Sequence, residues 1–317
     1  MSIEEEKPKK SAHVPFYRLI LSWSMVTDEI LNHQYHGSGT TQDPYRVEWL
    51  ENDPRNPLLF PSWIKWLITL LLSVACLSTS FSSSALSGAS PQIMAEFNSS
   101  KGLTIADTSL FVLAFAIGPA IWAPLSELYG RQIIFVITFM MTTLFSGAII
   151  ASQNITTILV FRFFAGAFGS SILANGGGVI SDIFTARERG LAAVLYLTAP
   201  FLGPSIGGIA AGFLSAAAGW RWLEVLITIL NGTAFISGLL LIPETYAPFL
   251  LQRRAARLST MTGKVYKSRL EIDNGHKTTG QIFRTTIIRP LVLLFREPIV
   301  FSLSVYMAIS KSLESLE

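Results

Sequence analysis

Long apolar segments alternate with short polar gaps through the middle of the chain, from about Trp63 to Ile242. Six of these segments are long enough to cross a bilayer, because a membrane-spanning helix needs roughly 20 mainly apolar residues. They cover residues 64–86, 107–125, 132–152, 157–180, 190–214 and 221–242. A backbone in lipid must satisfy its own hydrogen bonds, so each segment is expected to be a helix. The pattern therefore predicts an all-α polytopic membrane protein.

The polar flanks and gaps divide the chain into four regions. We predict a largely disordered N-terminal segment over residues 1–62, a six-span bundle over 63–243 and a polar central loop over 244–297. The apolar run PIVFSLSVYMAIS then falls within residues 298–317. Its 13 residues are too few to cross a bilayer comfortably, so we predict an incomplete seventh span followed by a divergent tail.

Composition supports a membrane location. Half of the 317 residues are hydrophobic, 14% are charged and the mean hydropathy is +0.46. Soluble domains carry about 25% charged residues. The net charge of +3 is too small to indicate a nucleic-acid partner. The single cysteine, Cys76, excludes an internal disulfide, and no Cys/His cluster indicates a metal site.

Basic residues in the short loops predict the orientation, since they concentrate on the cytoplasmic side of a membrane. Arg131 lies between spans 2 and 3, and Arg187 and Arg189 lie between spans 4 and 5. More basic residues follow span 6, whereas the opposite loops contain only Lys101 and Arg221. We therefore predict that both flanks of the six spans are cytoplasmic.

Two glycosylation sequons agree with this topology. Asn98 and Asn154 both fall in loops assigned to the outside, so the chain is predicted to be a glycoprotein at one or both. A third sequon, at Asn231, lies inside span 6 and is expected to stay unmodified.

The fifth span contains APFLGPSIGGIAAGFL, in which a proline is embedded among glycines. Gly203 and Gly207 have the spacing of small residues that lets helices approach closely, and Gly208 lies beside them. Pro204 removes a backbone hydrogen bond and favours a kink. We predict that span 5 packs tightly and bends here. GPSIG also matches a hydrolase nucleophile pattern, but it lies in mid-helix and every histidine is in a flank, so an enzyme is not indicated.

The fourth span contains an arginine. Arg162 is costly in a bilayer, so it is expected to face a polar interior or a partner, unless it snorkels to the outer interface. Asp182 caps the cytoplasmic end of the same span, and Asn175 is a candidate for lining a cavity.

These pieces together resemble the major facilitator superfamily, specifically the fungal twelve-span drug:proton antiporters. APLSELYGRQ, between spans 2 and 3, is similar to that superfamily's loop motif, with Leu125, Glu127, Gly130 and Arg131 on its positions. RFFAGAFGSS resembles the span-4 arginine motif, and APFLGPSIGG resembles the antiporter motif of span 5. Three positions depart from the loop motif: Ala123 replaces its first glycine, and Leu128 and Gln132 replace basic residues, which reduces its basic charge.

The resemblance implies the N-terminal six-helix half of a fold whose two halves rock around a central cavity. It implies export of a small organic molecule in exchange for protons, with the proton gradient as energy source and no cofactor. Arg162 would couple protonation to substrate occupancy. Glu127, Gly130 and Arg131 would form a latch that stabilises the outward-facing state. Helix packing and bending would fall to Gly166, Gly203, Pro204, Gly207 and Gly208.

The carboxylates of the first three spans bear on the proton pathway. Asp107 is expected at a membrane edge, and spans 1 to 3 show no deeply buried carboxylate. The proton-carrying acid is therefore expected outside this half. Glu224, at the start of span 6, has no assigned role.

Several alternatives stay open. The substrate is a drug, a polyamine or a fungal secondary metabolite, and the membrane is that of the plasma membrane or the vacuole. A nutrient uptake carrier is the second transporter hypothesis. A truncated chain would transport nothing, or would need self-association. A seven-span receptor would need an outside N-terminus, which conflicts with the charge asymmetry.

Overall fold

The computed structural model describes residues 16–274, 296–299 and 302. Residues 16–274 belong to one compact unit. The predicted seventh span lies almost entirely outside the described residues.

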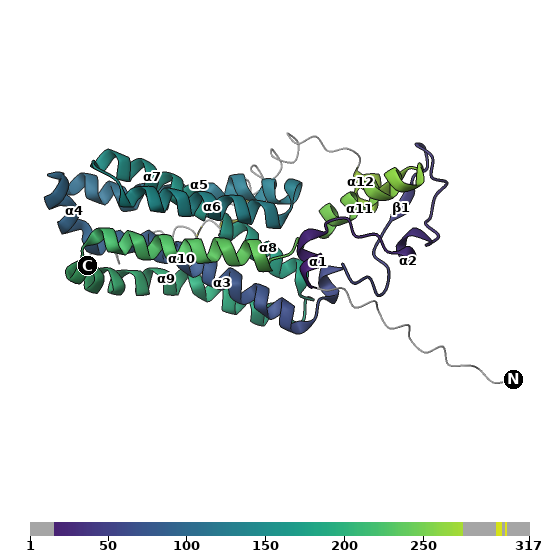
Figure 1. Cartoon of the computed structure of the whole chain (residues 1–317), viewed down its shortest axis with the longest axis horizontal. Coiled ribbons are helices and arrows are strands. Elements are labelled where there is room, and N and C mark those ends of the chain that lie inside the picture. The colour runs from purple at the N-terminus through teal and green to yellow at the C-terminus, as the bar shows by residue number, and fades with distance from the viewer. Residues whose placement is uncertain (1–15, 275–295, 300–301, 303–317) are drawn as a thin grey trace. The chain divides into compact units, whose positions relative to one another are not determined.

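Six helical segments of the described chain are long and apolar enough to cross a membrane, as predicted. They run side by side in Figure 1. The first consists of α3 (Ser62–Ala85), the turn η2 (Leu86–Ala89) and α4 (Ser90–Phe97), and the second and third are α5 (Lys101–Tyr129) and α6 (Arg131–Ile150). The last three are the pair α7 (Ile155–Gly169) and α8 (Ser171–Ile183), then α9 (Arg189–Ala218) and α10 (Trp220–Leu241). The prediction of an all-α, six-span bundle is confirmed.

The bundle is assembled from three main helix pairs: α3 packs on α9, α5 on α7, and α6 on α10. Helix α9 turns large apolar side chains outward, including Leu191 at 69% exposure and Phe213 at 78%. Such a surface suits lipid rather than water.

Two joints between consecutive helices have nearly the same backbone. Gly130 joins α5 to α6 with φ +95° and ψ 155°, and Gly219 joins α9 to α10 with φ +92° and ψ 161°. Glycine populates positive φ without the steric cost that a side chain adds. We call the end of the bundle at Gly130 the Arg131 end and the end at Gly219 the Arg221 end.

Residues 16–61, expected to be largely disordered, contain regular elements: α1 (Phe16–Leu21), α2 (Asp28–Leu31), β1 (Tyr45–Val47) and the turn η1 (Pro57–Leu59). Strand β1 pairs in parallel with β2 (Tyr266–Ser268), which lies between α11 (Ala247–Thr262) and α12 (Arg269–Asn274). Ile30 and Val47 pack in a small core with Leu258. The segment is ordered because its apolar residues meet partners that follow the sixth span.

A buried ion pair also joins these two segments. The guanidinium of Arg254 on α11 donates two hydrogen bonds to the carboxylate of Asp53, one of them at 3.1 Å. The ring of Trp49 lies 4.8 Å from the guanidinium carbon.

Candidate functional site

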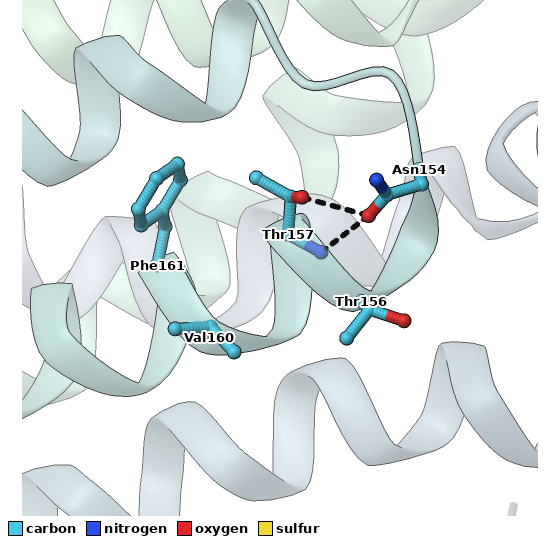
Figure 2. A pocket seen from close by; sticks show the side chains of 5 residues that line it. All are labelled: Asn154, Thr156, Thr157, Val160 and Phe161. Carbon is cyan, nitrogen blue, oxygen red and sulfur yellow. Dashed lines mark hydrogen bonds between the residues drawn. The ribbon is translucent and has the colours of Figure 1, made fainter.

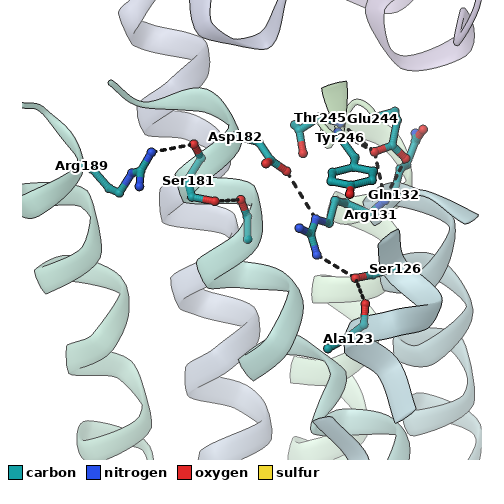
Figure 3. Close-up of polar contacts among 11 residues, drawn as sticks. Ala123, Ser126, Arg131, Gln132, Ser181, Asp182, Arg189, Glu244, Thr245 and Tyr246 are labelled. Carbon is teal, nitrogen blue, oxygen red and sulfur yellow. Dashed lines mark hydrogen bonds and ion pairs between the residues drawn. The ribbon is translucent and has the colours of Figure 1, made fainter. Parts of the chain in front are cut away.

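Arg131, the first residue of α6, joins several helix ends at the Arg131 end (Figure 3). Its Nη1 donates to Ser126 Oγ on α5 at 2.7 Å, and its Nε lies 3.3 Å from Asp182 Oδ2 on α8. The ring of Tyr246 lies 4.9 Å from its guanidinium carbon. The pair of Arg131 with Asp182 is shielded, since the two side chains keep 9% and 16% of their exposure. We call Ser126, Arg131, Asp182, Glu244 and Tyr246 the Arg131 cluster.

Glu244 supplies hydrogen-bond acceptors for the start of α6. The residue is fully buried, and the backbone N–H groups of Arg131 and Gln132 donate to its Oε1 and Oε2 at 3.0 and 3.1 Å. The N–H groups of Thr245 and Tyr246 also donate to Oε1, each at 2.9 Å. The first N–H groups of a helix lack intrahelical partners, and the helix dipole favours negative charge there. Glu244 therefore ties the segment after α10 to α6.

Two glycines make room for these side chains. A Cβ on Gly130 would collide with the carboxylate of Glu244, and its φ of +95° already disfavours any other residue. A Cβ on Gly178, one turn before Asp182 on α8, would lie only 2.6 Å from the guanidinium carbon of Arg131. Any side chain at either position would therefore displace part of the Arg131 cluster.

The structure brings together only some of the predicted latch residues. Arg131 pairs with Asp182, the predicted end of span 4, and Gly130 lies against the carboxylate of Glu244. Glu127 is exposed and forms no hydrogen bond or ion pair with any other described residue. Its carboxylate is therefore not paired with Arg131. Glu244 was not predicted as a site residue, although a carboxylate directly after a span, in the sequence PET, was a signal that could have indicated it.

Arg55 connects the folded N-terminal segment to the Arg131 cluster. Its Nη2 donates to the carbonyl oxygen of Glu244 at 3.0 Å, and its Nε donates to the carbonyl oxygen of Ser22 at 3.1 Å. Burial lowers the pKa of Arg55 to about 10, so the side chain stays charged at neutral pH. Trp23 Nε1 adds a hydrogen bond of 2.9 Å to the side chain of Gln132.

Arg162 lies on α7, deep among the helices. Its side chain keeps 1% of its exposure, and its Nε lies 3.3 Å from Asp107 Oδ2 on α5. Its Nη1 donates to the carbonyl oxygen of Ser82 on α3 at 2.9 Å. The ring of Phe111 lies 4.8 Å from its guanidinium carbon. Arg162 thus pairs inside the bundle and does not snorkel to an interface.

The expectation that spans 1 to 3 contain no deeply buried carboxylate is wrong at Asp107. Its side chain keeps 4% of its exposure and its Oδ1 has no hydrogen-bond partner. The reason is the length of α5, which begins at Lys101 and so places Asp107 well inside the helix, facing α7. Spans 1 to 3 therefore do contain a deeply buried carboxylate.

A second buried carboxylate belongs to Glu224 on α10. It is fully buried, and neither of its carboxylate oxygens has a hydrogen-bond partner. It interacts electrostatically with both Arg162 and Asp107. We call these three residues the Arg162 cluster.

Two of the predicted packing glycines in span 5 lie against α3. A Cβ on Gly203 would lie 2.6 Å from the Cβ of Ser80, and one on Gly207 would lie 2.7 Å from the carbonyl oxygen of Phe81. Gly208 faces away, with no atom within 4 Å of its Cβ position. The predicted close packing is therefore not found at Gly208.

Three other predicted residues also lie inside the bundle. A Cβ on Gly166 would lie 2.6 Å from the carbonyl oxygen of Phe111, so α7 approaches α5 closely there. The carbonyl oxygen of Pro204 accepts a hydrogen bond of 2.8 Å from Ser84 Oγ. Asn175 is buried and its amide group has no hydrogen-bond partner. Bending at Pro204 and a cavity at Asn175 stay predictions.

Both sequon asparagines are exposed. Asn154 precedes α7, and its Oδ1 accepts hydrogen bonds from the backbone N–H and the hydroxyl of Thr157 at 2.8 and 2.7 Å (Figure 2). It borders a shallow hollow that Val160 and Phe161 also line. Asn98 ends α4 with a positive φ of 48°. Glycosylation at either residue stays a prediction.

Within the described residues, no group of three or more His, Cys, Asp and Glu side chains could hold a metal ion.

The family model described as Major Facilitator Superfamily matches residues 72–314.

Named fungal proteins are similar over nearly the whole chain. The major facilitator superfamily multidrug transporter mdrA of Aspergillus fumigatus is 48% identical over 307 residues, which cover 97% of this chain and 50% of that protein. The MFS-type efflux pump MFS2 of Trichophyton rubrum is 49% identical over 309 residues, covering 98% and 51%. The efflux pump FUBT of Fusarium oxysporum is 44% identical over 308 residues, covering 96% and 52%. The chain thus spans about half the length of these curated relatives.

A solved structure shares the fold. The proton:xylose symporter XylE bound to 6-bromo-6-deoxy-D-glucose superposes with a TM-score of 0.53 at 16% sequence identity. The match covers 74% of this chain and 57% of that protein.

Proposed function

The chain belongs to the major facilitator superfamily, a family of membrane transporters, and we propose that its six-helix bundle is one half of a proton-coupled exporter of small organic molecules. The observation that carries this proposal is the buried pair of Arg162 and Asp107, which lies inside membrane-spanning helices. Ionisable residues in such helices are costly and mark substrate or proton pathways. The names of the relatives, multidrug transporters and efflux pumps, support outward transport.

A transport cavity of this kind forms between two bundles that rock against each other. We propose that the described bundle supplies one wall, with Asn175 facing the substrate, and that a second bundle supplies the other. The second bundle is either a further part of the polypeptide or a second copy of the chain. The substrate class is a drug, a polyamine or a fungal secondary metabolite, and protons are the coupling ion.

We place the Arg131 end on the cytoplasmic side, because the basic residues of the short loops gather there. The Arg131 cluster then holds the ends of α5, α6 and α8 together with the segment after α10. This arrangement closes one half of the cytoplasmic face and favours the outward-facing state. Glu127, exposed on the same face, is free to meet the second bundle. The membrane is the plasma membrane, with the vacuolar membrane as the alternative.

Uptake by vesicles with an acidic interior tests this function. The chain is reconstituted in lipid vesicles with the membrane potential clamped, and a permanently charged organic cation such as tetraphenylphosphonium is added outside. An exporter that exchanges substrate for protons accumulates the cation as protons leave, above the level of empty vesicles. Accumulation only with an alkaline interior would identify an uptake carrier, and accumulation in neither condition would leave the bundle without transport activity of its own.

A matched pair of variants assigns the effect to Arg162. Arg162→Lys is expected to abolish the gradient-driven accumulation, because lysine cannot repeat the fork of contacts to Asp107 and Ser82. Arg221→Lys is the control, since Arg221 also pairs with a carboxylate, Glu96, but keeps 40% of its exposure. It should keep most of the activity.

A further inference from the structure

Glu224 is the least satisfied charged group of the described bundle. It is fully buried on α10, and both of its carboxylate oxygens lack a hydrogen-bond partner. An ionised carboxylate buried without partners costs several kcal/mol, and such groups take up a proton instead. The other buried carboxylates of the described residues all accept hydrogen bonds: Asp107 from Arg162, Asp53 from Arg254, and Glu244 from backbone N–H groups.

The other charges around Glu224 are few. Electrostatic interaction reaches it from Arg162 on α7 and Asp107 on α5. Helix α10 packs on α6, α3 and α9, whose charged residues all lie toward the Arg131 end: Arg131, Lys65 and Arg189. On α10 itself, Arg221 pairs with Glu96 of α4. Among the described residues, Arg162 and Asp107 are therefore the charged groups that act on Glu224.

The Arg162 cluster contains two carboxylates and one guanidinium. If both carboxylates were ionised, the cluster would bury one uncompensated negative charge, and like charges that share a site cannot easily both ionise. One bound proton removes that charge. Arg162 contacts Asp107 and not Glu224 by hydrogen bonds, so in this conformation Glu224 is the better place for the proton.

We infer that Glu224 and Asp107 form a binding site for one exchangeable proton, which Glu224 holds while Arg162 is paired with Asp107. This inference rests on the proposed function and names the acid that the proposed proton coupling requires. Both residues of this site lie in the described bundle, Asp107 on the second span and Glu224 on the sixth.

Unused hydrogen-bonding atoms show how the proton can move. Nη2 of Arg162 and Oδ1 of Asp107 have no partner. A turn of the guanidinium toward Glu224 would pair it with that carboxylate, break the O–H bond there and release the proton to water or to the freed Asp107. One O–H bond breaks and one forms, so the charge of the cluster is unchanged when Asp107 receives the proton. When water receives it, the cluster gains one negative charge.

Infrared spectroscopy of the chain in lipid nanodiscs tests this site without any transport measurement. The C=O stretch of a protonated carboxyl, measured during a pH titration, should persist at neutral pH in the wild-type chain and in Glu96→Gln. It should be absent in Glu224→Gln, which keeps the shape of the side chain. Glu224→Asp should restore the band at a shifted frequency, which excludes a general disturbance of the fold.

Proton uptake in the same titration gives a second readout. Glu224→Gln should bind roughly one proton fewer per chain than the wild type across the range in which the band disappears. Asp107→Asn should change the pH at which the band disappears. A band that survives in Glu224→Gln, or a wild-type chain that shows no such band, would overturn the inference. Because no substrate is present, the site can be correct even if the chain transports nothing.

Discussion

Glu244 binds the backbone of Arg131 and not its guanidinium. The N–H of Arg131 donates to Glu244 Oε1 at 3.0 Å, while the Nε of the same residue lies 3.3 Å from Asp182. The two carboxylates therefore have separate tasks: one fixes where α6 begins, and the other fixes the direction of the side chain. Any movement of the segment after α10 must shift the start of α6 with it.

Replacement of Glu244 by alanine should destabilise the bundle. Four backbone N–H groups would lose their acceptor in a buried site, and we expect a loss of about 3 kcal/mol in the free energy of unfolding. Thermal unfolding in detergent measures the change. Glu127→Ala is the control, since this side chain is exposed and a change within about 0.5 kcal/mol is expected. Equal effects of the two variants would contradict the capping role of Glu244.

The joints at Gly130 and Gly219 allow backbone strain to be separated from the contact with Glu244. Both glycines have positive φ, but a Cβ on Gly219 would meet no atom within 4 Å. Gly219→Ala should therefore cost only the backbone strain, about 1–3 kcal/mol. Gly130→Ala should cost more, because it also displaces the carboxylate of Glu244. If both variants lost the same stability, the contact between the new methyl group at Gly130 and Glu244 would add no cost, which would contradict this prediction.

The ion pair of Asp107 should matter far more than the one at the surface. Asp107→Ala leaves the buried guanidinium of Arg162 without its paired carboxylate, so we expect a loss of about 3–5 kcal/mol of stability. Glu96→Ala removes the partner of Arg221, whose side chain is 40% exposed, and should cost under about 1 kcal/mol. Denaturant unfolding of the two variants measures the difference. A small effect at Asp107 would mean that Glu224 takes over the pairing with Arg162.

Adjacent glycines of α9 should respond in opposite ways. Gly207→Ala places a methyl group 2.7 Å from the carbonyl oxygen of Phe81, and a backbone atom cannot easily move, so we expect a loss of about 1–3 kcal/mol. Gly208→Ala meets no atom and should be neutral or stabilise the helix by up to about 1 kcal/mol. The melting temperatures of the two variants measure this difference in stability. A similar loss for both would show that α9 does not use Gly207 to approach α3.

The hydrophobic pattern predicted the number and kind of the spans because lipid imposes a long apolar helix at each crossing. The same pattern placed Arg131 and Asp182 at helix ends, because these polar residues lie where the apolar segments begin or end. The boundaries were less certain where polar residues continue a helix. Helix α5 begins at Lys101 and not near residue 107, so Asp107 lies within the helix, where it is buried against Arg162.

Partners that are distant in the chain could not be predicted from the spacing of residues. Glu127 and Arg131 are four residues apart, yet Arg131 pairs with Asp182, 51 residues later, and its backbone binds Glu244, 113 residues later. The order of residues 16–61 has the same origin, since β1 pairs with a strand that follows the sixth span. Local sequence does not specify such contacts, because they depend on how whole helices pack.

The direction of proton flow during substrate movement tests the proposed exporter most directly. The chain is reconstituted in vesicles that contain a pH-sensitive dye, and an organic cation is added outside with no imposed pH gradient. Exchange predicts that the interior becomes alkaline as the cation enters, and that Arg162→Lys abolishes this change while Arg221→Lys keeps it. An interior that becomes acidic with the cation, or one that stays constant while the cation enters, would contradict proton-coupled export.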